Sequence, residues 1–129
     1  MRNPQLERWE TRLMAVFNHI DDHLEETYGH LYPLHPARPA RGSTASKAQD
    51  GLFNIGASYS AGFGSRLGAG YVVEVRMVTL SRVPGEVRGR IEAEVADLLR
   101  RELPREFPGR RLEVTRDGNL FKIHGDLSF

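Results

Sequence analysis

The stretch from Gly51 to Gly70 constrains the fold more than any other part of this chain. Six of its twenty residues are glycine, the residue that loses the most backbone freedom on folding. Apolar residues nevertheless occupy every second position from Phe53 to Phe63 and alternate with small or polar ones. Period-two alternation is typical of a strand with one buried face. We therefore predict a strand over 52–63, with a glycine-containing turn over 64–70.

Two hairpins are predicted from the same pattern. A second alternating segment covers 71–80, and a short glycine-containing link between two such segments indicates a hairpin. Its apolar positions are Tyr71, Val73, Val75 and Met77, with Glu74 and Arg76 on the other face. Farther along the chain, Asp117-Gly118-Asn119 separates segments 111–116 and 120–125. Asp-Gly between alternating segments is a strong local signal for a hairpin.

Two amphipathic helices complete the pattern. The first is predicted over 4–28, because Asn3 suits the N-cap, Pro4 suits the first helical position and Gly29 can end the helix. Its apolar stripe repeats at intervals of three and four: Leu6, Trp9, Leu13, Val16, Phe17, Ile20 and Leu24. The second helix is predicted over 81–103, with Pro84 in its first turn and Pro104 and Pro108 ending it.

The resulting order is α-ββ-α-ββ. It predicts an α+β fold, a two-layer sandwich in which a four-stranded, mainly antiparallel sheet has helices on one face. The 129 residues suit one domain, with an N-terminal helix (4–28), a proline-rich loop (30–50) and a ββαββ core (51–126). Because this loop holds few large apolar residues, we expect it to be mobile or anchored by a partner.

Composition excludes several classes of function. The chain has no cysteine, which excludes disulfides, thiol catalysis and cysteine-bound metals. No apolar run reaches the length that spans a bilayer, and the first residues lack an apolar signal core. We therefore expect a cytoplasmic protein without a membrane partner. The net charge is only +1, so no general attraction to nucleic acid is expected.

The glycine-rich hairpin is the first candidate site. Backbone N–H groups of a glycine loop can hold a phosphate, because no side chain blocks the approach. The candidate residues for a small anionic, phosphate-containing ligand at 56–70 are Ser58, Ser60, Gly64, Ser65, Arg66 and Lys47. Neither a GxGxxG nor a GK[ST] motif is present. The alternative is a bent hairpin whose glycines lie where the backbone turns or packs closely.

The first helix carries the second candidate site. His19 and His23 lie four residues apart, so both imidazoles could reach one metal ion. Asp22 and Glu26 share this flank, and a third ligand would come from His30 or His35. The alternative is that His23 is a half-buried polar residue at the border of the apolar stripe.

The outer face of the predicted sheet and the basic residues of the loops give weaker candidates. Alternation places hydroxyl, imidazole and carboxylate groups on this face, where a nucleophilic triad would need them. They are Asn54, Ser58, Ser60, Glu74, Arg76, Glu113, Thr115, Lys122 and His124. If a partner covers the face, Glu74–Arg76 and Lys122–Glu113 are candidate ion pairs. A phosphate backbone could contact Arg38, Arg41, Lys47 and Arg66, but the aromatic residues fall on the core face.

Two functions from different classes follow. The first is a non-catalytic binding or assembly module that acts as a homo-oligomer, favoured by the broad aromatic stripe of the first helix and by the absence of a convincing catalytic set. The second is an enzyme or sensor that holds an anionic ligand at the glycine-rich hairpin. No cofactor is expected for either.

Overall fold

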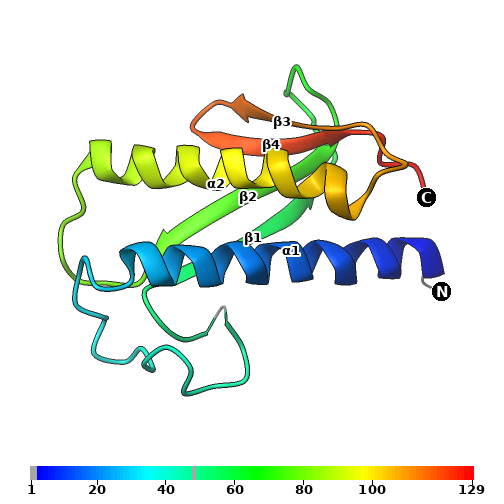
Figure 1. Ribbon diagram of the computed structural model, residues 1–129. Helices are drawn as coiled ribbons and strands as arrows, with labels where there is room; N and C mark the ends of the chain where they lie inside the picture. The colour runs from blue at the N-terminus through cyan, green and yellow to red at the C-terminus, as the bar shows by residue number, and fades with distance from the viewer. Residues whose placement is uncertain (1–2, 48) are drawn as a thin grey trace.

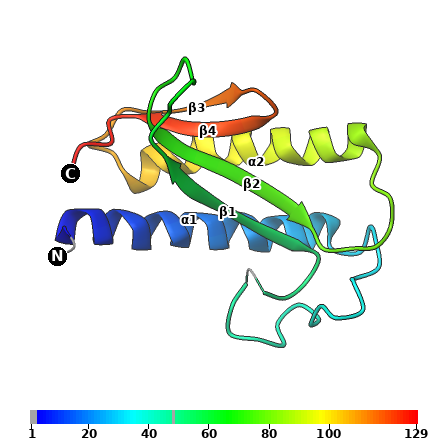
Figure 2. The same cartoon turned by 180° about the vertical axis from the view of Figure 1, so that it is seen from behind.

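The computed structural model describes residues 3–47 and 49–129. Its order is α1 (Pro4–Tyr28), β1 (Phe53–Ser60), β2 (Gly70–Met77), α2 (Gly85–Glu106), β3 (Leu112–Asp117) and β4 (Leu120–Gly125). The strands form one antiparallel sheet in the order β1-β2-β4-β3. Both helices lie on the same face of this sheet (Figures 1 and 2). The predicted two-layer α+β arrangement is therefore confirmed.

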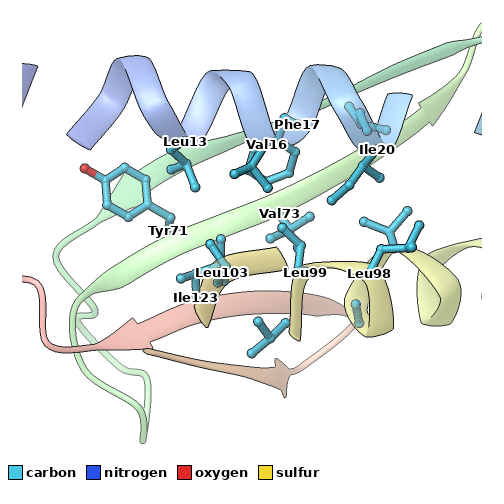
Figure 3. Close-up of a cluster of buried hydrophobic side chains, with 14 of the residues drawn as sticks. Leu13, Val16, Phe17, Ile20, Tyr71, Val73, Leu98, Leu99, Leu103 and Ile123 are labelled. Atoms are coloured by element: carbon cyan, nitrogen blue, oxygen red, sulfur yellow. The ribbon is translucent and has the colours of Figure 1, made fainter. Parts of the chain in front are cut away.

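The core lies between the helices and the sheet, and Figure 3 shows part of it. The apolar stripe of α1 packs toward the inner face of β1 and β2, and α2 completes the layer through Ile91, Val95 and Leu99. Asn3 caps α1 as predicted, because its side-chain oxygen accepts a hydrogen bond of 2.8 Å from Gln5 N. Among the described residues, no helix is both long and apolar enough to cross a membrane.

Strand β1 is shorter than the alternation predicts. It ends at Ser60, and Phe63, expected on the core face, is 97% exposed. The cause is Gly62, whose φ of +84° turns the chain out of the sheet. A Cβ at Gly62 would lie 2.1 Å from the main-chain carbon of Gly68, so the chain doubles back on itself here. The prediction for 61–63 is wrong because alternation of residue types continues past the point where the backbone turns.

The ends of the other elements differ by a few residues from the prediction. Strand β2 stops at Met77 rather than at residue 80, and β3 covers Leu112–Asp117 rather than 111–116. Helix α2 begins at Gly85, after Pro84, and continues through Pro104 to Glu106. Pro104 was expected to end this helix, but it lies in the last turn. Because proline has no N–H group, the main-chain carbonyl of Arg100 lacks its helical hydrogen bond, and Arg100 is exposed to water.

Candidate functional site

The loop that joins β1 to β2, residues 61–69, folds over the outer face of the sheet. Ile123 is fully buried on the helix side, so its neighbour Lys122 points to the opposite face. Lys122 is nevertheless buried there, with only 3% of its side chain exposed. The loop reaches it through Ser65 and Gly68, and at the start of β2 a Cβ at Gly70 would lie 2.8 Å from Lys122 Cγ.

The buried ammonium group of Lys122 fastens this loop to the sheet. Its Nζ donates to Ser65 Oγ (2.9 Å) and to the carbonyl oxygen of Gly68 (2.9 Å), and it lies 3.0 Å from Asp117 Oδ2. Ser65 Oγ in turn donates to Asp117 Oδ2 over 2.6 Å. This hydrogen bond and the Lys122 partner hold the pKa of Asp117 below its ordinary value. Because an ammonium group has three protons, the three partners engage all of them.

Beside this network is a hollow of about 300 Å³. The apolar side chains that line it are those of Phe63, Val72, Leu120 and Phe121, with Phe63 at the rim. We call these four residues the rim patch. Polar groups around it come from Ser60, Gly64, Ser65, Asp117 and Lys122. Leu120 is 41% exposed. The hollow therefore combines an exposed aromatic side chain with a loop that the Lys122 network holds in place.

The structure brings part of the predicted hairpin set together. Ser60, Gly64 and Ser65 line the hollow, and the Ser60 hydroxyl accepts a hydrogen bond from Gly62 N over 3.2 Å. Ser58 is exposed on the outer face, and the charge of the exposed Arg66 contributes to the lowered pKa of Asp117.

Lys47 lies elsewhere. It is in the loop that precedes β1 and pairs with Asp22 on α1. The hollow is lined partly by Phe63, Gly64 and Ser65 of the loop 61–69, which follows the other end of β1 (Figure 1). Eight residues of strand, about 26 Å, separate the two loops.

The proline-rich segment 30–50 is anchored by the chain itself. Arg41 Nη1 lies 2.7 Å from Asp21 Oδ1 and 3.3 Å from Asp50 Oδ1, and its Nη2 lies 2.7 Å from Asp22 Oδ1. Asp50 also accepts hydrogen bonds from Gly42 N (3.2 Å) and from Thr44 N (3.1 Å). Residue 48 lies outside the described part of the chain. Within the described residues these contacts tie the segment to α1, where the sequence predicted a mobile or partner-anchored loop.

Burial decides the pKa shift of Asp21 in this Arg41 cluster, but not that of Asp50. It raises the pKa of Asp21 to about 7 against the attraction of Arg41, while Glu25 and Asp22 raise it further. Burial also acts on Asp50, but the hydrogen bonds from Thr44 and the charge of Arg41 outweigh it and lower the pKa of Asp50. Arg38 completes the anchor by donating to the carbonyl oxygens of Gly51 (2.9 Å) and Phe53 (3.0 Å). Arg38 and Arg41 therefore donate to acceptors within the chain, and the exposed Lys47 is paired with Asp22.

The two helix histidines face different neighbours. His23 Nε2 lies 3.9 Å from Glu94 Oε1 on α2, whereas His19 lines a groove of about 1030 Å³ beside segment 29–34. Among the described residues, no three His, Asp or Glu side chains are grouped closely enough to hold a metal ion.

On the outer face, the predicted pair of Lys122 with Glu113 is replaced by Lys122 with Asp117. Glu113 lies 3.9 Å from His124 Nδ1, and His124 Nε2 is 2.8 Å from Thr115 Oγ1. Both contacts of His124 are therefore with residues of the β3–β4 hairpin. A triad would instead require a contact between His124 and Ser58 or Ser60.

Sequence reasoning missed two features of the site: the burial of Lys122 and the full exposure of Phe63. Alternation assigns Lys122 to the outer face, but nothing local indicates that a loop 57 residues away covers it. The signal for Phe63 was present in the glycines on either side of it, at 62 and 64, which favour a turn.

Comparisons with known proteins identify relatives across almost the whole chain. A family model described as "Uncharacterised protein" matches residues 4–125. A relative from Borreliella burgdorferi, also described as an uncharacterized protein, is 34% identical over 125 residues. The alignment covers 97% of this chain and 98% of that relative. No solved structure gives a significant match.

Proposed function

The chain belongs to this family of uncharacterised proteins, and we propose that it is a binding module that assembles with a second copy of itself through the rim patch. The supporting observation is Phe63, which is 97% exposed on a loop fastened by the buried Lys122. Burying a phenylalanine side chain contributes roughly 1.5–3 kcal/mol. A fully exposed one, held on an anchored loop, is the typical anchor of a protein–protein interface.

A second copy fits this surface because the patch offers both halves of a contact. Phe63 projects into solvent, and the hollow of about 300 Å³ beside it has apolar walls from Val72, Leu120 and Phe121. A two-fold axis brings the same patch of each protomer against the other. Phe63 of each protomer then enters the hollow of the other protomer, and this aromatic contact requires no further surface.

The outer face of β1 and β2 supplies further contact area. Gly56 and Ser58 leave this face smooth, since a Cβ at Gly56 would meet nothing within 4 Å. Glu74 and Arg76 are exposed there, and neither side chain has a hydrogen bond or an ion pair with another described residue. Opposite charges close to a two-fold axis can pair reciprocally. A stable interface buries about 800 Å² on each partner, and this face can contribute the buried area that the rim patch alone does not supply.

The alternative from the sequence is an enzyme or sensor that binds a phosphate-containing ligand at hairpin 56–70. In that case the ligand must displace the Asp117 carboxylate, because Asp117 and the loop already engage Lys122. The rim patch therefore favours assembly over anion binding at this hairpin.

The experiment compares Phe63→Ser with Leu80→Ser. Both side chains are exposed, at 97% and 73%, but Leu80 lies between β2 and α2, at the other end of β2. Light scattering after size exclusion should give a dimer for the wild type and for Leu80→Ser, and a monomer for Phe63→Ser with unchanged circular dichroism. A dimer that survives Phe63→Ser refutes the rim patch, and equal loss in both variants refutes its specificity.

A further inference from the structure

We propose that a cleft between the first turns of α1 and the end of α2 binds a phosphoryl dianion. The cleft has a volume of about 250 Å³ and is lined by Gln5, Arg8, Trp9, Arg12, Phe107 and Arg110. It is separate from the rim patch and shares no residue with it. Anion binding is thus proposed at this cleft and not at the glycine-rich hairpin, because some N–H groups of the cleft arginines have no partner among the described residues.

The residues that line the cleft are rich in hydrogen-bond donors. Three of the six residues are arginine, and none is a carboxylate. Arg8 is exposed, and its side chain makes no hydrogen bond or ion pair with any other residue in the described part of the chain. The first turn of α1 adds the positive end of the helix dipole near Gln5. An anion is the ligand that such a set of donors requires.

Arg12 is held in position at the edge of this cleft. Its Nε donates to Glu106 Oε1 over 2.8 Å, its Nη2 donates to the main-chain carbonyl of Glu106, and its guanidinium lies 5.1 Å from the centre of the Phe107 ring. Within the described residues its Nη1 takes no hydrogen bond and stays available. A donor that is already ordered loses less entropy when a ligand binds.

Arg110 is held in the same way from the other side. Its Nη1 donates to the carbonyl oxygens of Ser128 (2.8 Å) and Asp126 (3.2 Å), and its guanidinium lies 4.3 Å from the centre of the Phe129 ring. Among the described residues, its Nη2 has no hydrogen-bond partner. Arg12 and Arg110 thus each keep a free N–H group on a fixed guanidinium.

Two of the three cleft arginines already have a carboxylate partner, since Glu106 pairs with Arg12 and Asp126 lies 3.6 Å from Arg110. Glu7 adds a further carboxylate to the first turn of α1, so Arg8 is the cleft arginine whose side chain has no ion pair with another described residue. The planar guanidinium fork matches two oxygens of a phosphate group. Three such groups around a small polar cleft suit a phosphoryl dianion, either inorganic phosphate or the end of a small phosphomonoester.

The test is a calorimetric titration of the full chain at physiological ionic strength, with inorganic phosphate in one arm and glycerol phosphate in the other. Binding of either ligand to the wild type is expected, and the arm with higher affinity identifies the source of the phosphoryl group. Arg8→Gln should weaken binding by about tenfold, because one charge-assisted contact is lost. Since Arg8 has no partner in the described residues, this variant should fold normally.

Two matched variants remove one positive charge elsewhere. Arg88→Gln alters the exposed surface of α2, and Arg66→Gln alters the glycine-rich hairpin. Both should retain wild-type affinity. The proposal is overturned if the wild type binds neither ligand, if Arg88→Gln weakens binding as much as Arg8→Gln does, or if only Arg66→Gln abolishes it. That last result would return the anion site to the hairpin.

Discussion

Arg41 shows how one side chain can join a loop that holds few apolar residues, segment 30–50, to a helix. Its guanidinium contacts Asp21 and Asp22 of α1 and Asp50 at the end of the segment. Asp21 and Asp50 are almost fully buried, where unpaired carboxylates would be costly. Tyr32 and Leu34 pack the start of the segment against the core, and charge pairing fixes its end, so this part of the anchor depends on the protonation of the carboxylates around Arg41.

Asp21→Asn should remove a pH dependence of stability. The pKa of Asp21 is about 7 in the fold and 3.8 ordinarily, so the folded state holds an extra proton between these values. The free energy of unfolding of the wild type therefore falls as pH rises through this window, by up to about 1.4 kcal/mol per pH unit. The pKa values of Asp22 and Asp50, which also lie near Arg41, are lowered. Their stabilising effect is therefore lost only at lower pH. Urea unfolding between about pH 5 and pH 7 measures the slope.

The control for this experiment is Asp97→Asn, which alters an exposed carboxylate on α2. It should keep the wild-type slope, whereas Asp21→Asn should flatten it. An unchanged slope in Asp21→Asn would show that burial does not raise the pKa of Asp21.

At the scale of elements, the loop over 61–69 depends on one glycine more than on the others. Gly62 and Gly68 both have positive φ, but a Cβ at Gly62 would meet the main chain at 2.1 Å, whereas a Cβ at Gly68 would meet nothing. Gly68→Ala should cost about 1–2 kcal/mol, the penalty of the left-handed backbone alone. Gly62→Ala should cost clearly more, because the doubled-back chain must also open. Denaturant midpoints of the two variants compare these costs, and equal midpoints would contradict the close approach at Gly62.

The sequence predicts some boundaries of the helices and strands correctly and misses others. Helix α1 was predicted at its observed bounds, because its cap and apolar stripe are local signals. The end of β1 was not, since Gly56 and Gly62 occupy equivalent alternating positions although only Gly62 turns the chain. Pro104 was misjudged because a proline in a last turn leaves only one exposed carbonyl without a partner. What failed in each case was a property of the backbone conformation, which residue type alone does not specify.

At the scale of the whole molecule, the candidate site was only partly accessible from the sequence. Ser60, Gly64 and Ser65 are neighbours along the chain and remain together around the hollow. Lys47 was grouped with them by charge, but its partner is Asp22, 25 residues earlier in the chain. Lys122 contacts a loop 57 residues before it. Contacts at such distances along the chain are determined by the packing of the sheet, which local patterns do not reveal.

A charge exchange on the outer face tests the two-fold arrangement of the assembly. In the proposed dimer, Glu74 of one protomer lies near Arg76 of the other, so Glu74→Arg should weaken the dimer through like charges. Adding Arg76→Glu to this variant restores opposite charges and should recover the affinity. Sedimentation equilibrium of both variants measures the dissociation constant. If the double variant is as weak as Glu74→Arg alone, the two residues do not meet across the axis.

The mass of the unaltered chain in solution shows whether this protein assembles with itself. The protomer has a mass of 14.6 kDa. Sedimentation of the wild type over a concentration series at micromolar levels should give twice this mass, with dissociation only on dilution. A mass of 14.6 kDa at every concentration would contradict the account.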